Sequence, residues 1–213
     1  HHKSRYPKIF FSEEEITTAL ERLYKDGRII SETTEEGNQI VYLKNNLYIE
    51  NKIVEHLVRK VTKTKPLNRY STEKIAFVLE KLEASTGLKL APQQKEAVHM
   101  ALQENMSILT GGPGTGKTQT MGAMIQCMKT LTPNATIHLC SPTGKAAKRM
   151  NEMAGMPAST IHRLVKIFDM KRQGEDVLIN GDILIVDEAS MIDAYVFYRL
   201  LSSLDDGIRL III

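Results

Sequence analysis

The chain of 213 residues has only two cysteines and a net charge of only +3. Cys127 and Cys140 lack the spacing of a metal site, so we expect both to be reduced interior residues of a cytoplasmic protein. No apolar run approaches the roughly 20 residues that a membrane-spanning helix needs, so no membrane partner is expected. Signal-peptide patterns, internal repeats and low-complexity tracts are not found either. The small positive charge permits nucleic-acid binding but does not argue for it.

The most informative segment that is present is the octapeptide GGPGTGKT, residues 111–118. It fits the phosphate-binding pattern G-x-x-x-x-G-K-[ST] and lies between a strand-like stretch and a helix-like segment. Glycines let backbone N–H groups point at an anion, and the helix start adds the positive end of its dipole. Lys117 is expected to reach the β- and γ-phosphates, and Thr118 to ligate Mg²⁺. The expected nucleotide-binding residues of this segment are Gly112, Pro113, Gly114, Thr115, Gly116, Lys117, Thr118 and Gln119. The alternative, a glycine-rich turn that binds nothing, is disfavoured by the complete pattern in this context.

A second segment, DILIVDE at residues 182–188, is an apolar run that ends in two carboxylates. Such a run predicts a strand buried on both faces of a parallel sheet, and such sheets bind ligands at their carboxyl ends. We expect Asp187 to hold Mg²⁺ and Glu188 to orient and deprotonate the attacking water. The alternative is a solvated strand end whose acid caps a helix. The phosphate loop upstream in the same chain favours the catalytic interpretation over this alternative. Lys117, Asp187 and Glu188 are therefore the predicted catalytic residues for nucleotide hydrolysis.

Residues 1–68 are predicted to form a small accessory domain. Ser12 followed by three glutamates is typical of a helix start, and Gly27 ends that helix. Strand-like pieces at 28–31 and 39–43 flank a polar turn and predict a hairpin. A mostly helical unit with a hairpin resembles winged-helix or helix-hairpin-helix DNA-binding domains. The alternative is an accessory domain that has this shape but does not bind DNA.

An amphipathic helix is predicted over residues 46–63, before a linker helix within 69–87. The basic residues near the end of the first helix are either solvated or in contact with a phosphate backbone. They are Arg59, Lys60, Lys63 and Lys65. From residue 88 to 213 strands and helices alternate, which predicts an α/β fold with a parallel sheet. The predicted strands are 107–109, 137–140, 183–186 and 209–213, and the predicted helices are 92–104, 119–131, 144–154, 160–168 and 194–204.

Further segments carry a resemblance to a known family. They are LAPQQKEAV at 90–98, SPTGKAAKRM at 141–150, TIHRL at 160–164 and DEASMID at 187–193. Together with the phosphate loop they resemble, in residue type, order and spacing, the RecD-like branch of superfamily 1 DNA helicases. Residues 10–85 resemble, in weaker patterning, the small domains that precede the motor in stand-alone RecD-like helicases. The resemblance implies a RecA-like P-loop NTPase lobe behind a small, mostly helical domain.

The resemblance also implies roles for individual residues. Gln94 matches the glutamine that reads the adenine edge, since a side-chain amide both donates and accepts; an exposed helix residue is the alternative. The residues that match segments contacting single-stranded DNA are Pro142, Thr143, Gly144, Lys145, Thr160, Ile161 and His162. Lys148 and Arg149 either add charge to that surface or form a solvated helix face. ATP and Mg²⁺ are the implied cofactors, and single-stranded DNA is the implied partner.

Finally, the resemblance implies that the chain is part of a longer protein whose second lobe completes the ATP site with arginines. We expect this chain alone to bind nucleotide weakly, to hydrolyse it very slowly and not to unwind DNA. The intact protein is expected to be an ATP-dependent helicase that moves 5′ to 3′ on single-stranded DNA in repair or recombination. An RNA helicase of the same superfamily, a small-molecule kinase and a non-enzymatic nucleotide- or DNA-binding module are the alternatives.

Overall fold

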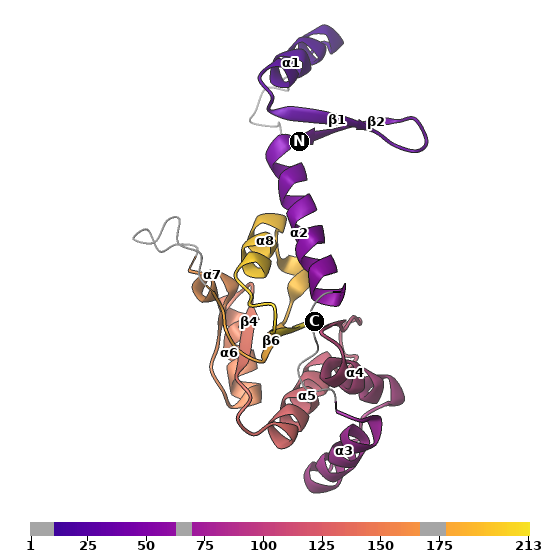
Figure 1. Cartoon of the computed structure of the whole chain (residues 1–213), viewed down its shortest axis with the longest axis vertical. Coiled ribbons are helices and arrows are strands. Elements are labelled where there is room, and N and C mark those ends of the chain that lie inside the picture. The colour runs from indigo at the N-terminus through magenta and orange to yellow at the C-terminus, as the bar shows by residue number, and fades with distance from the viewer. Residues whose placement is uncertain (1–10, 63–69, 167–177) are drawn as a thin grey trace, which may run out of the picture. The chain divides into compact units, whose positions relative to one another are not determined.

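The computed structural model describes residues 11–62, 70–166 and 178–213 (Figure 1). The chain divides into two compact units, His1–Lys52 and Ile53–Ile213, and the division falls inside the helix α2 (Lys44–Thr62). The domain boundaries expected from the sequence, 1–68, 69–87 and 88–213, remain predictions. Throughout the described ranges, every helix is too short or too polar to cross a lipid bilayer.

The first unit contains the predicted helix and hairpin. They are α1 (Glu13–Lys25), β1 (Ile29–Thr33) and β2 (Gln39–Leu43), with the two strands antiparallel. Ser12 caps α1, because its hydroxyl accepts the N–H of Glu15 at 3.2 Å. The Glu15 carboxylate in turn accepts the N–H of Ser12 at 2.7 Å, which completes a capping box. The capping serine and the acidic first turn therefore fix the start of this helix.

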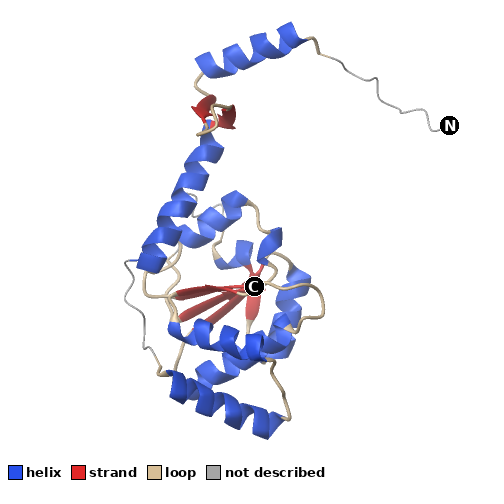
Figure 2. Cartoon of the chain, turned by 90° about the vertical axis from the view of Figure 1, so that its right-hand side faces the viewer, coloured by secondary structure: helices blue, strands red, loops and turns tan. Residues whose placement is uncertain are grey.

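The second unit is built on a parallel sheet of five strands. Its strands are β3 (Met106–Ile108), β4 (Ile137–Ser141), β5 (Ala158–Thr160), β6 (Ile183–Val186) and β7 (Arg209–Ile212). Their order across the sheet is β3-β7-β6-β4-β5, and every neighbouring pair is parallel. Figure 2 shows helices on both faces of the sheet. The predicted α/β class, with a RecA-like P-loop lobe, is confirmed.

The helices of this unit agree with the predicted ones to within about three residues at most of their ends. They are α3 (Thr72–Thr86), α4 (Pro92–Gln103), α5 (Lys117–Leu131), α6 (Gly144–Ala154), α7 (Ile161–Leu164) and α8 (Ala194–Ser202), with a 3₁₀ turn, η2 (Ala189–Met191). The helix predicted over 160–168 is α7 as far as Leu164, and residues 167–168 lie outside the described ranges. Its predicted first residue, Thr160, belongs instead to the short strand β5, because it pairs with Ser141 at the end of β4.

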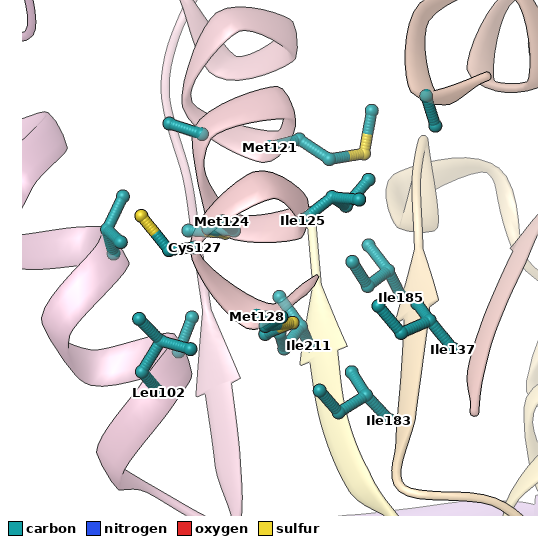
Figure 3. Packing of buried hydrophobic residues seen from close by; sticks show 14 of the residues in the cluster. Leu102, Met121, Met124, Ile125, Cys127, Met128, Ile137, Ile183, Ile185 and Ile211 are labelled. Atoms are coloured by element: carbon teal, nitrogen blue, oxygen red, sulfur yellow. The ribbon is translucent and has the colours of Figure 1, made fainter. Parts of the chain in front are cut away.

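Side chains along each central strand alternate between two buried clusters. In β6, Ile183 and Ile185 pack with the cluster under α3, α4 and α5, and Figure 3 shows them near the methionines of α5. Leu184 and Val186 point to the opposite cluster, which α7 and α8 cover. All four residues of β6 are buried. The prediction of a strand buried on both faces is confirmed, and its burial holds the acids that follow it at a defined edge.

Helix α3 packs directly on the lobe. Ile75, Val78 and Leu79 on one side of this helix are buried in the same cluster as α4 and α5. The segment predicted as a linker therefore contributes side chains to the hydrophobic core of the second unit.

The basic end of α2 differs from its prediction. The side chain of Lys60 is only 6% exposed, and its ammonium donates to three backbone carbonyls, those of Asp205 (3.1 Å), Asp206 (3.1 Å) and Ile208 (2.8 Å). Arg59 forms an ion pair with Asp206. The prediction that the cluster is solvated or faces phosphate is thus wrong for Lys60, whereas Lys63 and Lys65 lie outside the described residues.

Candidate nucleotide and DNA site

The phosphate loop joins the end of β3 to the start of α5 at the carboxyl edge of the sheet. Gly116, directly before α5, has φ 82°, a left-handed conformation that favours glycine. A Cβ at this position would lie 2.3 Å from Nε2 of Gln94, so any other residue would displace the end of that flexible side chain. The loop therefore makes a tight turn directly before α5, and it lies at the positive end of the dipole of this helix.

Lys117 lies against its own loop. Its ammonium donates to the carbonyls of Gly111 and Gly112, the latter at 3.0 Å. The Thr115 hydroxyl donates to the same Gly112 carbonyl at 2.8 Å and so stiffens the loop. An ammonium has three N–H donors, so this arrangement leaves Lys117 able to donate to a phosphate oxygen as well.

Gln94 is tied to the phosphate loop by both ends of its amide. Its Oε1 accepts the N–H of Ala91 at 2.9 Å, and its Nε2 donates to the carbonyl of Thr115 at 3.0 Å. The first bond caps α4 and the second reaches across to the loop. One N–H and one lone pair of the amide remain for a further partner such as an adenine edge.

The two carboxylates follow β6 in an unusual backbone conformation. Glu188 has φ 55° and ψ 38°, left-handed values that cost a non-glycine residue about 1–2 kcal/mol. Neighbouring bonds hold it there: Oδ1 of Asp187 accepts the Glu188 N–H at 2.9 Å, and Ala189 N–H donates to the Ile213 carbonyl at 2.9 Å. Strain of this kind, held by its surroundings, is frequent at active sites.

A cavity of about 760 Å³ brings these groups together. Lys117, Thr118, Asp187 and Glu188 all line it, together with Arg149 of α6. Its volume is within the range of small-molecule sites, about 300–1,000 Å³. Gln119 instead lines a neighbouring hollow of about 250 Å³ between α3, α5 and α6.

The donor set of the cavity fits Mg²⁺ bound together with a nucleotide. Mg²⁺ prefers one or two carboxylates, water and phosphate oxygens over an all-protein cage. Thr118 supplies a hydroxyl and Asp187 a carboxylate. Within the part of the chain that the structure describes, no group of three His, Cys, Asp or Glu side chains forms a separate metal cage.

The segments expected to contact DNA lie beside this cavity. Thr143 caps α6 by accepting the N–H of Ala146 at 3.2 Å, and Thr160 caps α7 by accepting the N–H of Arg163 at 3.3 Å. A hollow of about 590 Å³ is lined by Gly144, Thr160, Lys148 and Arg163. Pro142, Lys145 and His162 are not among its lining residues. The structure therefore joins parts of both predicted segments in one hollow, which Glu152 also lines and in which it pairs with Lys148 at 4.0 Å.

Both cysteines are buried and free. Burial raises the pKa of Cys127 to about 11 and that of Cys140 to about 12. Their thiols therefore stay neutral at physiological pH, and the prediction of interior thiols is confirmed.

Comparison with known proteins agrees with this geometry. A family model described as an AAA domain matches residues 94–213, more than half of the chain. The ATP-dependent RecD2 DNA helicase of Deinococcus radiodurans is 32% identical over 203 residues, which are 93% of this chain and 27% of that protein. The chain belongs to the AAA domain family. It is similar to RecD-like helicases over most of its own length.

Other RecD-like relatives match a similar part of the chain. The RecBCD enzyme subunit RecD of Buchnera aphidicola (strain APS) is 30% identical over 81% of this chain and 31% of its own length. That of Haemophilus influenzae is 32% identical over 77% of this chain and 29% of its own length. The chain thus spans about a quarter to a third of the length of these relatives.

In this RecD-like chain, the sequence interpretation missed contacts between distant segments. It treated Arg149 as a solvated or DNA-facing residue, whereas Arg149 lines the nucleotide cavity. It did not select Arg163, although that residue directly follows His162 in the second DNA-contacting segment. It also missed the contact of Thr143 with Glu188, whose hydroxyl and carboxylate lie 3.4 Å apart. A periodic pattern locates a residue on its own helix but not the partner it meets.

Proposed function

We propose that the cavity binds and hydrolyses ATP with Mg²⁺, and that hydrolysis drives movement along single-stranded DNA in the intact protein. The observation that carries this proposal is the meeting of Lys117, Thr118, Asp187 and Glu188 in one cavity. The strained backbone of Glu188 adds weight, because strain concentrates where a side chain must be aimed. The names of the relatives, an ATP-dependent DNA helicase and RecD subunits, support the motor function.

Each residue of the cavity has a role in the proposal. Lys117 stabilises negative charge on the β- and γ-phosphates, and the loop residues 112–116 surround the phosphates. Thr118 and Asp187 hold Mg²⁺, which supplies charge neutralisation at the phosphates when bound. Glu188 orients and deprotonates the attacking water. Gln94 contacts the adenine edge with the part of its amide that the loop leaves available.

In the same proposal, single-stranded DNA lies across the amino ends of α6 and α7. Pro142, Thr143, Gly144 and Lys145 bind one stretch of its backbone, since a helix start offers free N–H groups to a phosphate. Thr160 and His162 bind the next stretch. Translocation runs 5′ to 3′, in DNA repair or recombination. The first 68 residues form an accessory DNA-binding domain, and residues 69–87, whose helix α3 packs on the lobe, lead to the lobe at 88–213.

A single set of variants of the intact protein tests the ATPase. Lys117→Ala should abolish ATP binding and DNA-stimulated hydrolysis, whereas Lys129→Ala, near the other end of α5, should keep both. Glu188→Gln should keep ATP binding and lose turnover, because the base is removed while the Mg²⁺ ligands remain. Full activity of Lys117→Ala would refute the motor proposal, and loss of ATP binding in Glu188→Gln would refute the role of Glu188.

Two further measurements separate the alternatives. Competition between DNA and RNA oligonucleotides of matched sequence distinguishes a DNA motor from an RNA helicase, because the 2′-hydroxyl is the group by which a protein tells RNA from DNA. Hydrolysis by this 213-residue chain alone, expected to be near zero with or without DNA, tests whether a second lobe completes the site. Clear DNA-stimulated turnover by the chain would overturn the two-lobe account.

A further inference from the structure

Two sides of helix α6 line two different hollows. One side lines the hollow of about 590 Å³ beside the proposed DNA-binding segments, with Gly144, Ala147, Lys148, Asn151 and Glu152. Another side lines the cavity of about 760 Å³ that contains the phosphate loop, with Ala146, Arg149 and Met150. The two sets follow the helical repeat, because residues three or four apart lie on the same side of a helix. The adjacent basic residues Lys148 and Arg149 therefore belong to different sites.

The guanidinium of Arg149 is available to a ligand. Within residues 11–62, 70–166 and 178–213, its side chain is exposed and makes no ion pair or hydrogen bond. Lys148 differs, because its ammonium lies 4.0 Å from the carboxylate of Glu152. The other cation that lines the cavity, Lys117, already donates to two carbonyls of its own loop. Arg149 therefore brings to the cavity a guanidinium whose five N–H donors are all available.

A phosphate group is the ligand that fits these donors. The planar fork of a guanidinium matches two oxygens of one phosphate, which gives a pair of parallel charge-assisted hydrogen bonds. The same cavity is lined by the carboxylates of Asp187 and Glu188, which repel the triphosphate of a nucleotide. Lys117 and Arg149 are the cations that line it and offset this repulsion. The charge balance of the cavity therefore favours a contact between Arg149 and the nucleotide.

The position of α6 indicates which phosphate Arg149 contacts. Thr143, directly before this helix, has its hydroxyl 3.4 Å from a carboxylate oxygen of Glu188, so α6 begins beside the proposed catalytic acid. In the proposed function Glu188 directs water at the terminal phosphate, which therefore lies on the α6 side of the cavity. We propose that Arg149 binds the γ-phosphate and so lets this lobe distinguish ATP from ADP. This inference rests on the proposed function, and it adds an arginine of this lobe to those expected from a second lobe.

The test measures the affinity of the intact protein for two nucleotides by titration calorimetry, with Mg²⁺ and without DNA. The nucleotides are ADP and the non-hydrolysable β,γ-imido analogue of ATP. Arg149→Gln should weaken binding of the analogue about 10–100-fold, since hydrogen bonds to a charged group are lost, and change ADP binding less than about 2-fold. Arg149→Lys keeps the charge but loses the planar fork, so its affinity for the analogue should lie between those of Arg149→Gln and the wild type.

The adjacent residue provides the matched control. Lys148→Gln removes a positive charge from the same exposed helix but from the other hollow, and it should keep both nucleotide affinities. Arg149→Gln should in turn keep the wild-type affinity for a poly-dT oligonucleotide and the wild-type Tm, because Arg149 is exposed and does not line the DNA hollow.

The outcomes separate this inference from the proposed function. An Arg149→Gln variant that binds the analogue as the wild type does, or that loses affinity equally for ADP and the analogue, would overturn this inference alone. Loss of oligonucleotide binding with unchanged nucleotide binding would overturn it too, since Arg149 would then belong to the DNA surface. A wild-type protein that binds neither nucleotide would overturn the proposed function and this inference with it.

Discussion

Replacing Lys60 with methionine should destabilise the second unit. The ammonium of Lys60 is buried and donates to three carbonyls in the turn between α8 and β7. Methionine keeps most of the aliphatic stem but leaves these carbonyls without that donor, at about 1 kcal/mol or more each. Burial lowers the pKa of the Lys60 ammonium, which shows that the native protein already bears a desolvation cost that methionine relieves. The net loss should be about 2 kcal/mol, or roughly 4–8 °C in Tm for a unit of this size.

Thermal and urea unfolding of the purified chain measure this change, and the adjacent residue provides the control. Arg59 pairs with Asp206 on the same turn, but both side chains are 54% exposed. Arg59→Met should therefore change stability by less than about 1 kcal/mol, because exposed ion pairs contribute little. Equal effects of the two substitutions, or no effect of Lys60→Met, would refute the argument that the buried ammonium anchors this turn.

Two other predictions concern the phosphate loop and the interior thiols. Gly116→Ala should reduce stability by about 1–2 kcal/mol because of its positive φ, and it should weaken ATP binding because the new Cβ displaces the end of the Gln94 side chain. Gly112→Ala, with open space around it, should be nearly neutral in thermal unfolding. Burial raises the folded-state pKa values of Cys127 and Cys140 from the ordinary 9.0 to about 11 and about 12. The stability that the two buried neutral thiols contribute is therefore complete below pH 9 and is lost as the pH rises toward these values. Urea unfolding should show a loss of about 1 kcal/mol per thiol and pH unit above 9, and the double alanine variant should lack this part of the slope; an unchanged slope would contradict the burial argument.

Strongly patterned segments of the fold could be predicted from the sequence. The apolar run of β6 and the helix α6 have the predicted bounds, 183–186 and 144–154, because uninterrupted burial and helical periodicity are local signals. The strand β5 was missed because three half-buried residues carry no such pattern. Its existence depends on pairing with the edge of β4, which local residues do not encode.

Lys60 was misinterpreted although a local signal was present. It follows Ile53 and Leu57 by seven and three residues, so it lies on the same face of α2 as these two apolar side chains. Its position among other basic residues predicts a solvated side chain, whereas its place on the apolar face of α2 predicts a buried one. At the candidate site, the motif residues were predicted, but the contacts Gln94 to Thr115 and Thr143 to Glu188 come from the packing of separate strands and helices.

The left-handed backbone at Glu188 lowers the stability of the fold, whereas the proposed chemistry needs a glutamate at this position. A glycine at this position would relieve the strain, and an asparagine would tolerate it better than a glutamate does. Variants chosen only for heat resistance would therefore accumulate substitutions at the residue proposed to activate water. Stabilising substitutions for laboratory use should be made at other positions, since glycine or asparagine favours thermal stability here and glutamate favours turnover.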